Sequence, residues 1–290
     1  MTTPRPAADS KPPQSDSASL TRAHYDFVSG LLRERAGIVL EDKDYLIDSR
    51  LRALVVQLGE KQTLDSFVRK ARTDRRLQES VVDAMTTNET SFFRDPQLFD
   101  ILRDSVLPQL HEQQRATRRL RIWCAACASG QEPYSLAILI REQLPWLLNW
   151  DVQILATDIS GSVLDRARKA EFNRFEVGRG LGPDLVRRYF DEDGTTWRIR
   201  DEIRSMVQFK PVNLVTAWPP MPAFDLVLLR NVLIYFSRED RDRVLQRASR
   251  VMSPEGYLFL GASEASVSPD TGLAREEFAR LAGYRPMVRT

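Results

Sequence analysis

The sequence predicts an α/β fold with a mostly parallel, doubly wound sheet, preceded by a region that contains helices only. From about residue 118 onward, strand-like apolar runs alternate with helical segments, which is typical of a parallel sheet covered by helices. Residues 224–229 are apolar except for Asp225, as expected of a strand that is buried on both faces. Residues 20–85, in contrast, show apolar positions at helical spacing.

Residues 1–18 contain few large apolar side chains and are predicted to form a disordered tail. Helices are predicted over residues 20–37, 41–58, 63–71 and 75–85, and Gly37 and Gly59 end the first two. Together these segments predict an N-terminal helical domain over residues 19–85, which is a reasonable size for a compact bundle.

Basic residues gather near the end of this helical region, where Asp74 is the only acidic residue among them. The cluster consists of Arg69, Lys70, Arg72, Arg75 and Arg76, and Arg50 and Arg52 add charge on the preceding helix. Two interpretations remain open at this stage. The cluster is either a solvated face or a docking surface for an acidic protein partner.

Residues 86–96 form a linker that fits neither helical nor strand periodicity. They read Thr-Thr-Asn-Glu-Thr-Ser-Phe-Phe-Arg-Asp-Pro, so polar residues are followed by aromatic and then charged ones. Because loops between domains often carry function, we expect this linker to line an active site. Residues 97–290 then form the α/β domain, which opens with a helix over residues 96–113.

The remaining elements follow in alternation. Strands are predicted from Ile122 through Cys124 and at 152–157, 224–229 and 256–260, and helices at 132 onward, 161–170, 183–190 and 238–252. The Asp193-Gly194 pair is a turn signal and predicts a short hairpin over residues 196–210. Residues 284–288 are predicted to form a final edge strand.

A strand, a tight turn and a helix start follow one another over residues 122–135. Gly130 permits close approach of a ligand to the backbone, and Glu132 begins the helix, an arrangement against which nucleotide-like cofactors bind. A purely structural turn remains the alternative, since one glycine is a weak fingerprint. Cys124 and Cys127 also have a redox or zinc spacing, but no second cysteine pair or nearby histidine completes such a site, so we predict no metal.

Two further strand ends carry polar residues. Asp158 follows the strand at 152–157 and is placed to accept hydrogen bonds from ribose hydroxyls, with a helix N-cap as the alternative role. Arg230, Asn231 and Tyr235 follow the buried strand at 224–229. Since ligands bind beyond the carboxyl ends of parallel strands, we expect all four side chains at one edge of the sheet.

Composition narrows the function classes. The chain has 290 residues, 42% of them hydrophobic and 28% charged, and a formal net charge of +2, which does not suggest a nucleic-acid partner. Two cysteines and the absence of an apolar run of membrane-spanning length predict a cytoplasmic protein without membrane insertion. With His24 and His111 as the only histidines, histidine-dependent hydrolysis is disfavoured.

Four motifs in this order resemble the chemotaxis-receptor glutamate O-methyltransferases of the CheR type. They lie at residues 86–94, 127–135, 156–159 and 230–236, and the resemblance extends from about residue 25 to about residue 286. It implies a small N-terminal helical domain joined to a Rossmann-like class I methyltransferase domain with an inserted β-subdomain, here expected at about residues 191–211. It also implies transfer of a methyl group from S-adenosyl-L-methionine to glutamate side chains on the cytoplasmic helical bundle of chemoreceptors, leaving S-adenosyl-L-homocysteine.

The resemblance also assigns roles to particular residues. Arg94 and Tyr235 match the side chains at the acceptor carboxylate. The residues that match cofactor contacts are Asn88, Thr90, Arg94, Glu132 (methionine part), Asp158 (ribose), Asn213 and Leu214 (adenine), Arg230 and Asn231.

The short span between Phe190 and Trp197 argues against binding of the tethering peptide found at the C-terminus of some receptors. The alternatives are a methyltransferase for another carboxylate, a non-catalytic module that binds S-adenosyl-L-homocysteine, and a nicotinamide-dependent dehydrogenase. The last would require a three-glycine loop that the sequence lacks.

Overall fold

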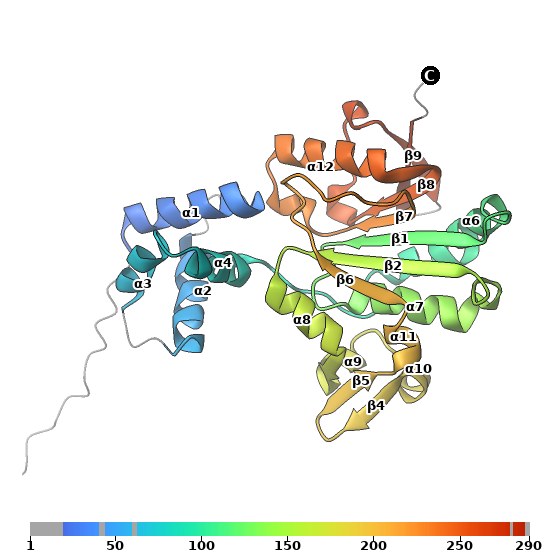
Figure 1. Cartoon of the computed structure of the whole chain (residues 1–290), viewed down its shortest axis with the longest axis horizontal. Coiled ribbons are helices and arrows are strands. Elements are labelled where there is room, and N and C mark those ends of the chain that lie inside the picture. Colours follow the sequence, from blue (N-terminus) through green and yellow to red (C-terminus); the bar gives the residue numbers. More distant parts are fainter. Residues whose placement is uncertain (1–19, 41–43, 60–62, 279–280, 288–290) are drawn as a thin grey trace, which may run out of the picture.

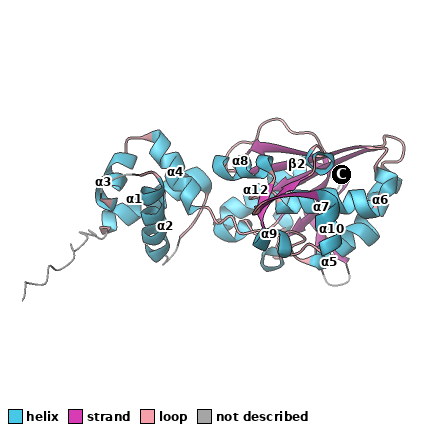
Figure 2. Ribbon diagram, turned by 90° about the horizontal axis from the view of Figure 1, so that it is seen from below, coloured by secondary structure: helices cyan, strands magenta, loops and turns pink. Residues whose placement is uncertain are grey.

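The computed structural model describes residues 20–40, 44–59, 63–278 and 281–287, so the predicted tail at 1–18 lies outside the described residues. Helices α1 (Arg22–Ala36), α2 (Asp44–Gln57), α3 (Leu64–Ala71) and α4 (Arg75–Met85) come first. Gly37 ends α1 in the left-handed conformation (φ 69°), as its position in the sequence predicts. Figures 1 and 2 show these helices gathered beside a larger body that contains the strands.

The first four helices have a hydrophobic core of their own. Leu32, Ile47, Leu51 and Phe67 are fully buried in it, and each lies on the inner face of its helix. The apolar positions at helical spacing in residues 20–85 therefore form the core of this helical region, as predicted.

The linker leads into a continuous helical stretch, as predicted for residues 96–113. It consists of α5 (Pro96–Ile101), a π-helical turn η1 (Leu102–Val106) and α6 (Leu107–Gln113). The buried side chains of this stretch pack against one face of the sheet that follows.

The larger body is built on a seven-stranded sheet, in the order β6-β2-β1-β7-β8-β10-β9 among the described residues. These strands are β1 (Arg119–Ala125), β2 (Asp151–Asp158), β6 (Val207–Pro211), β7 (Phe224–Leu229), β8 (Met252–Leu260), β9 (Leu273–Phe278) and β10 (Leu281–Pro286). The first five in the spatial order are parallel, whereas β10 is antiparallel to both of its neighbours. The predicted mixed α/β fold with a mostly parallel sheet is confirmed.

Helices cover both faces of this sheet. They include α7 (Gln131–Gln143), α8 (Gly161–Lys169) and α12 (Arg238–Val251), and the 3-10 turns are η2 (Pro145–Leu147), η3 (Leu233–Tyr235), η4 (Ala262–Glu264) and η5 (Pro269–Thr271). Along β1, Ile122 and Cys124 belong to the core on one face, whereas Trp123 and Ala125 belong to the core on the other. This alternation explains why the strand is apolar throughout.

A second, small sheet has the order β3-β5-β4 and corrects the predicted hairpin. Its strands are β3 (Glu171–Asn173), β4 (Phe190–Asp193) and β5 (Thr196–Ile199), and the short helices α9 (Arg174–Gly178), α10 (Pro183–Tyr189) and α11 (Asp201–Arg204) adjoin it. The hairpin predicted over residues 196–210, and the β-subdomain range of about 191–211, are wrong. Gly194 does form a turn, but it joins β4 to β5, and β6 pairs in parallel with β2 in the large sheet.

The last strand also differs from its prediction. β10 is an inner strand between β8 and β9, and β9 is the edge strand. A Cβ atom on Gly283 would lie 2.8 Å from the Phe278 ring and 3.1 Å from the Phe259 ring, so the neighbouring side chains close over this strand from both sides. The predicted edge strand at 284–288 overlaps only the end of β10, which begins at Leu281. β9 was not predicted, because most of its side chains are not buried.

The strand order places the carboxyl ends of β1, β2 and β7 together. β1 lies between β2 and β7, and this reversal of strand order is the usual ligand-binding position in open α/β sheets. These strand ends face the α1–α4 region (Figure 1).

Candidate functional site

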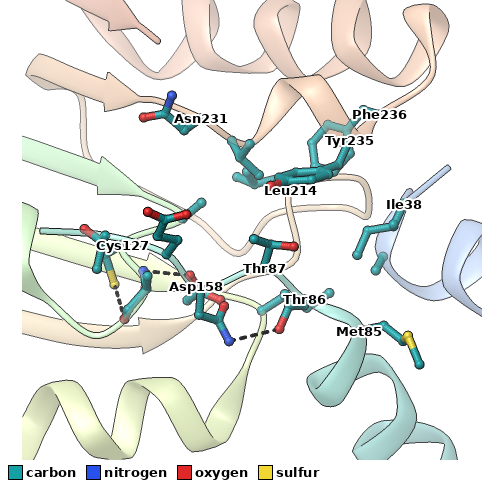
Figure 3. A pocket seen from close by; sticks show the side chains of 18 of the residues that line it. Ile38, Met85, Thr86, Thr87, Cys127, Asp158, Leu214, Asn231, Tyr235 and Phe236 are labelled. Carbon is teal, nitrogen blue, oxygen red and sulfur yellow. Dashed lines mark hydrogen bonds between the residues drawn. The ribbon is translucent and has the colours of Figure 1, made fainter. Parts of the chain in front are cut away.

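A cavity of about 1190 Å³, including its open mouth, lies between the carboxyl edge of the large sheet and the α1–α4 region. Its sheet wall is formed by residues 126–128, 132, 158–159, 212–214, 230–232 and 235–236. Its helical wall is formed by Ala36, Ile38, Leu40, Leu46, Arg50 and Met85, and the linker runs between the two walls. Figure 3 shows Cys127 and Asp158 on one side, with Ile38 and Met85 on the other.

The structure brings all of the predicted site residues together around this cavity. Its lining includes Asn88, Thr90, Arg94, Glu132, Asp158, Asn213, Leu214, Arg230, Asn231 and Tyr235. These residues come from five separate segments of the chain, and only folding makes them neighbours.

The turn after β1 forms one side of the sheet wall. Ala126 (φ 57°), Ala128 (φ 47°) and Gly130 (φ 92°) all adopt the left-handed conformation, which non-glycine residues rarely do. A Cβ atom on Gly130 would lie 3.1 Å from the Tyr134 ring, so this position also favours glycine for steric reasons. The small residues of this stretch thus permit a tight backbone path.

Asp158 is buried at the end of β2 and fixes that turn. Its Oδ2 accepts a hydrogen bond from the Ala128 N–H at 2.9 Å, and its Oδ1 accepts one from the Ser160 N–H at 3.0 Å. The N-cap of α8 is Ser160, whose hydroxyl accepts from the Val163 N–H, so the alternative role of Asp158 as the N-cap residue is wrong. Burial raises the pKa of the Asp158 carboxyl, and the backbone N–H groups oppose that shift.

Glu132 and Arg230 form a buried ion pair across the sheet wall. Arg230 Nη1 donates to Glu132 Oε2 at 2.7 Å, and the two side chains are 3% and 12% exposed. Arg230 Nη2 also contacts the Asp95 carboxylate and the Arg94 carbonyl oxygen. Burial raises the pKa of the Glu132 carboxyl, and the guanidinium of Arg230 counters this. Arg230 therefore joins the linker to the first turn of α7.

Hydrogen bonds from two arginines shape the linker: Arg50 holds its start, and Arg94 bonds within it. At its start, Arg50 Nη1 donates to the carbonyl oxygens of Met85 (2.5 Å) and Thr86 (3.1 Å), and Arg50 Nη2 donates to the Thr87 hydroxyl (2.9 Å). Near its end, Arg94 Nη1 donates to the Glu89 carbonyl oxygen at 2.9 Å. Arg94 is half-buried and lines the cavity.

Two predicted residues make contacts that connect the walls. The Asn213 side-chain amide donates to the Arg35 carbonyl oxygen at 2.5 Å, and the Tyr235 carbonyl oxygen accepts from the Val39 N–H at 2.9 Å. Leu214 is buried beside them. In Figure 3 the side chains of Leu214 and Tyr235 lie between the sheet wall and Ile38.

Strained backbone gathers around the cavity. Phe93, Asp95, Ala126, Ala128 and Asn231 all have positive φ, and each lies in or next to a segment that lines the cavity. Such conformations persist only where the surroundings enforce them, and they are common at functional sites.

The helical wall and Asp95 were not predicted from the sequence. Arg50 was interpreted as part of the basic cluster, and nothing in its spacing indicates that it contacts the linker. Asp95 precedes Pro96, a helix-start signal, yet its carboxylate contacts Arg230 and makes no capping hydrogen bond. That departure is visible only in three dimensions.

Cys124 and Cys127 are both buried thiols, and burial raises the pKa of each. In the described ranges, no group of three or more His, Cys, Asp or Glu residues could hold a metal ion. Of the helices that the structure describes, none combines the length and hydropathy needed to span a bilayer.

Comparison with known proteins identifies the family. The model of the CheR methyltransferase SAM-binding domain matches residues 88–277. The chain is 46% identical over 253 residues to chemotaxis protein methyltransferase 1 of Pseudomonas aeruginosa, covering 85% of this chain and 92% of that protein. It is 41% identical over 254 residues to a chemotaxis protein methyltransferase of Vibrio parahaemolyticus, covering 85% of this chain and 90% of the relative. The chain therefore belongs to the CheR family of S-adenosylmethionine-binding methyltransferases.

Proposed function

We propose that this enzyme transfers a methyl group to glutamate side-chain carboxylates on the cytoplasmic helical bundle of chemoreceptors and so forms glutamate methyl esters. S-Adenosyl-L-methionine, the cofactor of the family, supplies that methyl group on a sulfonium centre when bound. The observation that carries the proposal is the convergence of Arg94 and Tyr235 on the same cavity as Glu132 and Asp158.

The cavity fits this cofactor by the chemistry of its donors and acceptors. A carboxylate has about four acceptor sites, so Asp158 retains capacity for ribose hydroxyls beyond its two backbone N–H partners. Glu132 likewise retains capacity for an ammonium group beside Arg230. The cavity is open to solvent on one side, which gives an acceptor side chain a route to the cofactor.

The acceptor needs positioning more than it needs a base. A glutamate carboxylate, with an ordinary pKa of about 4.3, is already ionised at neutral pH. We propose that Arg94 orients this carboxylate through its fork of N–H donors and that Tyr235 donates a hydrogen bond to it or faces the sulfonium with its ring. Positioning to an attack distance of about 3–3.5 Å accounts for much of the barrier in reactions of this type.

Two alternatives are separated by their outcomes. An enzyme for another carboxylate would transfer methyl groups to a small molecule but not to receptor fragments. A non-catalytic module would bind S-adenosyl-L-homocysteine without transferring methyl groups. The helical wall disfavours the first, and the placement of Arg94 and Tyr235 disfavours the second.

Methyl transfer from labelled cofactor to receptor cytoplasmic fragments, followed by peptide mapping, tests the proposal. Wild-type enzyme should label glutamate residues of the helical bundle. Arg94→Ala should lower kcat by about 100-fold or more, because one catalytic donor is typically worth that much, while the thermal unfolding temperature stays near that of the wild type. Arg94→Lys serves as the control that keeps the charge but loses the fork. Full turnover of Arg94→Ala would remove this residue from the site.

We further propose a division into a helical domain (19–85), a linker (86–96) and a methyltransferase domain (97–290), in a cytoplasmic protein. The separate core of α1–α4 supports this division. Only two turn residues join β4 to β5, so this hairpin is short. Because the tether peptide would bind at the β-subdomain, we expect no measurable binding of that peptide by calorimetry. Micromolar binding would contradict this expectation.

A further inference from the structure

Glu264 is a fully buried carboxylate that no motif in the sequence pointed to. It lies on η4, directly after β8 and beside the end of β7, and none of its surface is exposed. Burial of a carboxylate is costly unless it is well hydrogen-bonded, so its partners indicate what it does.

Backbone N–H groups of the sheet wall donate to this carboxylate. Glu264 Oε2 accepts from the Asn231 N–H at 2.7 Å and from the Gly261 N–H at 2.8 Å. Glu264 Oε1 accepts from the Ile234 N–H at 3.2 Å. Two of these three donors belong to the loop that carries Asn231 and Tyr235 into the cavity.

The backbone around Glu264 brings its carboxylate close to Gly261 and Asn231. Asn231 has a φ of 58°, in the left-handed region that asparagine adopts more readily than most non-glycine residues. A Cβ atom on Gly261 would lie 2.6 Å from Glu264 Oε2 and 2.8 Å from Asn231 Nδ2, so glycine is needed for the chains to approach. The carboxylate thus fixes the backbone path of the 231–235 loop through its hydrogen bonds.

The backbone that carries Glu264 is itself held by side chains from two other elements. Arg241 Nη2 donates to the carbonyl oxygens of Glu264 (2.6 Å) and Ser266, and the Tyr284 hydroxyl donates to the carbonyl oxygen of Ala265. This support comes from α12 and β10, neither of which contributes to the cavity lining. A chain of contacts therefore extends from the far side of the sheet to the cavity.

We propose that Glu264 is a positioning residue that sets the Asn231–Tyr235 loop for cofactor binding and methyl transfer. It acts through two backbone N–H groups and does not itself line the cavity. This inference rests on the proposed function. It assigns a role in the reaction to Glu264, which lies outside the four sequence motifs.

Glu264→Gln tests this role with little change in shape. The amide has one acceptor oxygen, so either the Asn231 and Gly261 N–H groups or the Ile234 N–H must face an NH₂ group. Asp225→Asn is the matched control, because Asp225 is also a buried carboxylate that accepts a backbone N–H, from Arg121 at 2.8 Å, but lies at the opposite end of β7.

S-Adenosyl-L-homocysteine binding by calorimetry, kcat at saturating cofactor and the thermal unfolding temperature are measured for each variant. Glu264→Gln should weaken binding by about tenfold and lower kcat by about tenfold, since a hydrogen bond to a charged group is worth that much. Asp225→Asn should lower the unfolding temperature while changing both functional values by less than about twofold. Equal functional losses in the two variants would reduce Glu264 to a structural residue and overturn the proposal.

The double variant with Asn231→Ala provides a second readout. If Glu264 acts through the loop, Glu264→Gln should weaken binding far less in the Asn231→Ala background than in the wild type, whereas independent effects would add. Full additivity would contradict the proposal. Should Glu264→Gln fail to fold, Glu264→Asp keeps the charge but withdraws it from the loop, and wild-type affinity in that variant would also contradict it. Failure of the wild-type enzyme to bind S-adenosyl-L-homocysteine would instead overturn the proposed function.

Discussion

The two walls of the cavity are held in different ways. The sheet wall has left-handed turns at Ala126 and Asn231, and buried carboxylates with several hydrogen bonds each fix those turns. Among the described residues, the helical wall presents mainly apolar side chains, and hydrogen bonds such as Val39 N–H to the Tyr235 carbonyl oxygen join it to the sheet wall. Arg50, a charged side chain of this wall, contacts the linker.

This difference suggests a division of labour. A wall with fixed donors and acceptors suits a ligand of constant structure, which we propose is the cofactor. A mainly apolar wall suits the stem of an acceptor side chain that must arrive and leave at each turnover. Variants on the sheet wall should therefore change cofactor affinity, whereas variants on the helical wall should change acceptor kinetics.

The largest effect is expected from Asp158→Ala. It removes the proposed ribose contacts and leaves the Ala128 and Ser160 N–H groups without their partner, so S-adenosyl-L-homocysteine binding should weaken by about 100-fold. Asp151→Ala, at the other end of β2 and half-exposed, is the control and should bind normally. Calorimetry measures both. Unchanged affinity in Asp158→Ala would show that the sheet wall does not hold the cofactor.

The pH dependence of binding tests Glu132. Burial raises the pKa of its carboxyl above the ordinary value of 4.5, so protonation begins at a higher pH than for an exposed glutamate. As the pH falls through this raised pKa, affinity for S-adenosyl-L-homocysteine should fall by up to about tenfold per pH unit. Calorimetry across pH 4–8 measures this, and Glu132→Gln should bind weakly with a flatter profile.

The stability contribution of Glu132 has the opposite sign. A carboxyl whose pKa is raised on folding favours the folded state below its ordinary pKa, and this contribution is lost as the pH rises through the raised value. Loss of binding on acidification therefore should not come from unfolding at this residue. Identical pH profiles of the wild type and Glu132→Gln would exclude Glu132 as the titrating group.

Arg50→Met, on the helical wall, should have a smaller effect than Asp158→Ala, and it should act on acceptor kinetics. Without its guanidinium, the start of the linker loses three hydrogen bonds, so kcat/KM for the receptor fragment should fall by about tenfold while cofactor affinity changes by less than about threefold. Arg52→Met, on the same helix but paired with Asp48, is the matched control. A larger loss of cofactor affinity than of acceptor kinetics would contradict the division between the walls.

The smallest effect is expected from the basic cluster. Arg76→Glu should raise KM for the receptor fragment a few-fold, and the effect should shrink with added salt if an acidic surface docks there. Arg72 is less suitable, because its guanidinium lies 4.6 Å from the Phe27 ring centroid and donates to the Ala23 carbonyl oxygen. Arg187→Glu is the control, because it reverses the charge of an exposed arginine on α10, outside the basic cluster. An unchanged KM in Arg76→Glu would favour a merely solvated face.

Patterns with strong local causes were predicted well. The α4 boundaries and the run of β7 follow directly from helical periodicity and from continuous burial. The small sheet was mispredicted because β3, at residues 171–173, and the exposed strand β4 carry no alternating pattern, so their pairing with β5 depends on neighbours distant in sequence. The outer strand β9 was missed for the same reason, so β10 was wrongly predicted to lie at the edge of the sheet.

The sequence by itself determined the α1–α4 region, the alternating core of the large sheet, the family and the motif residues of the site, because these depend on local periodicity and on short motifs. Only the tertiary structure decided that Arg50 contacts the linker, that Arg230 joins Asp95 to Glu132, and that Glu264 supports the 231–235 loop. Each of these contacts joins residues between 30 and 135 positions apart in the sequence. No local pattern encodes such a partner, because burial and hydrogen bonding at these positions are set by the packed whole.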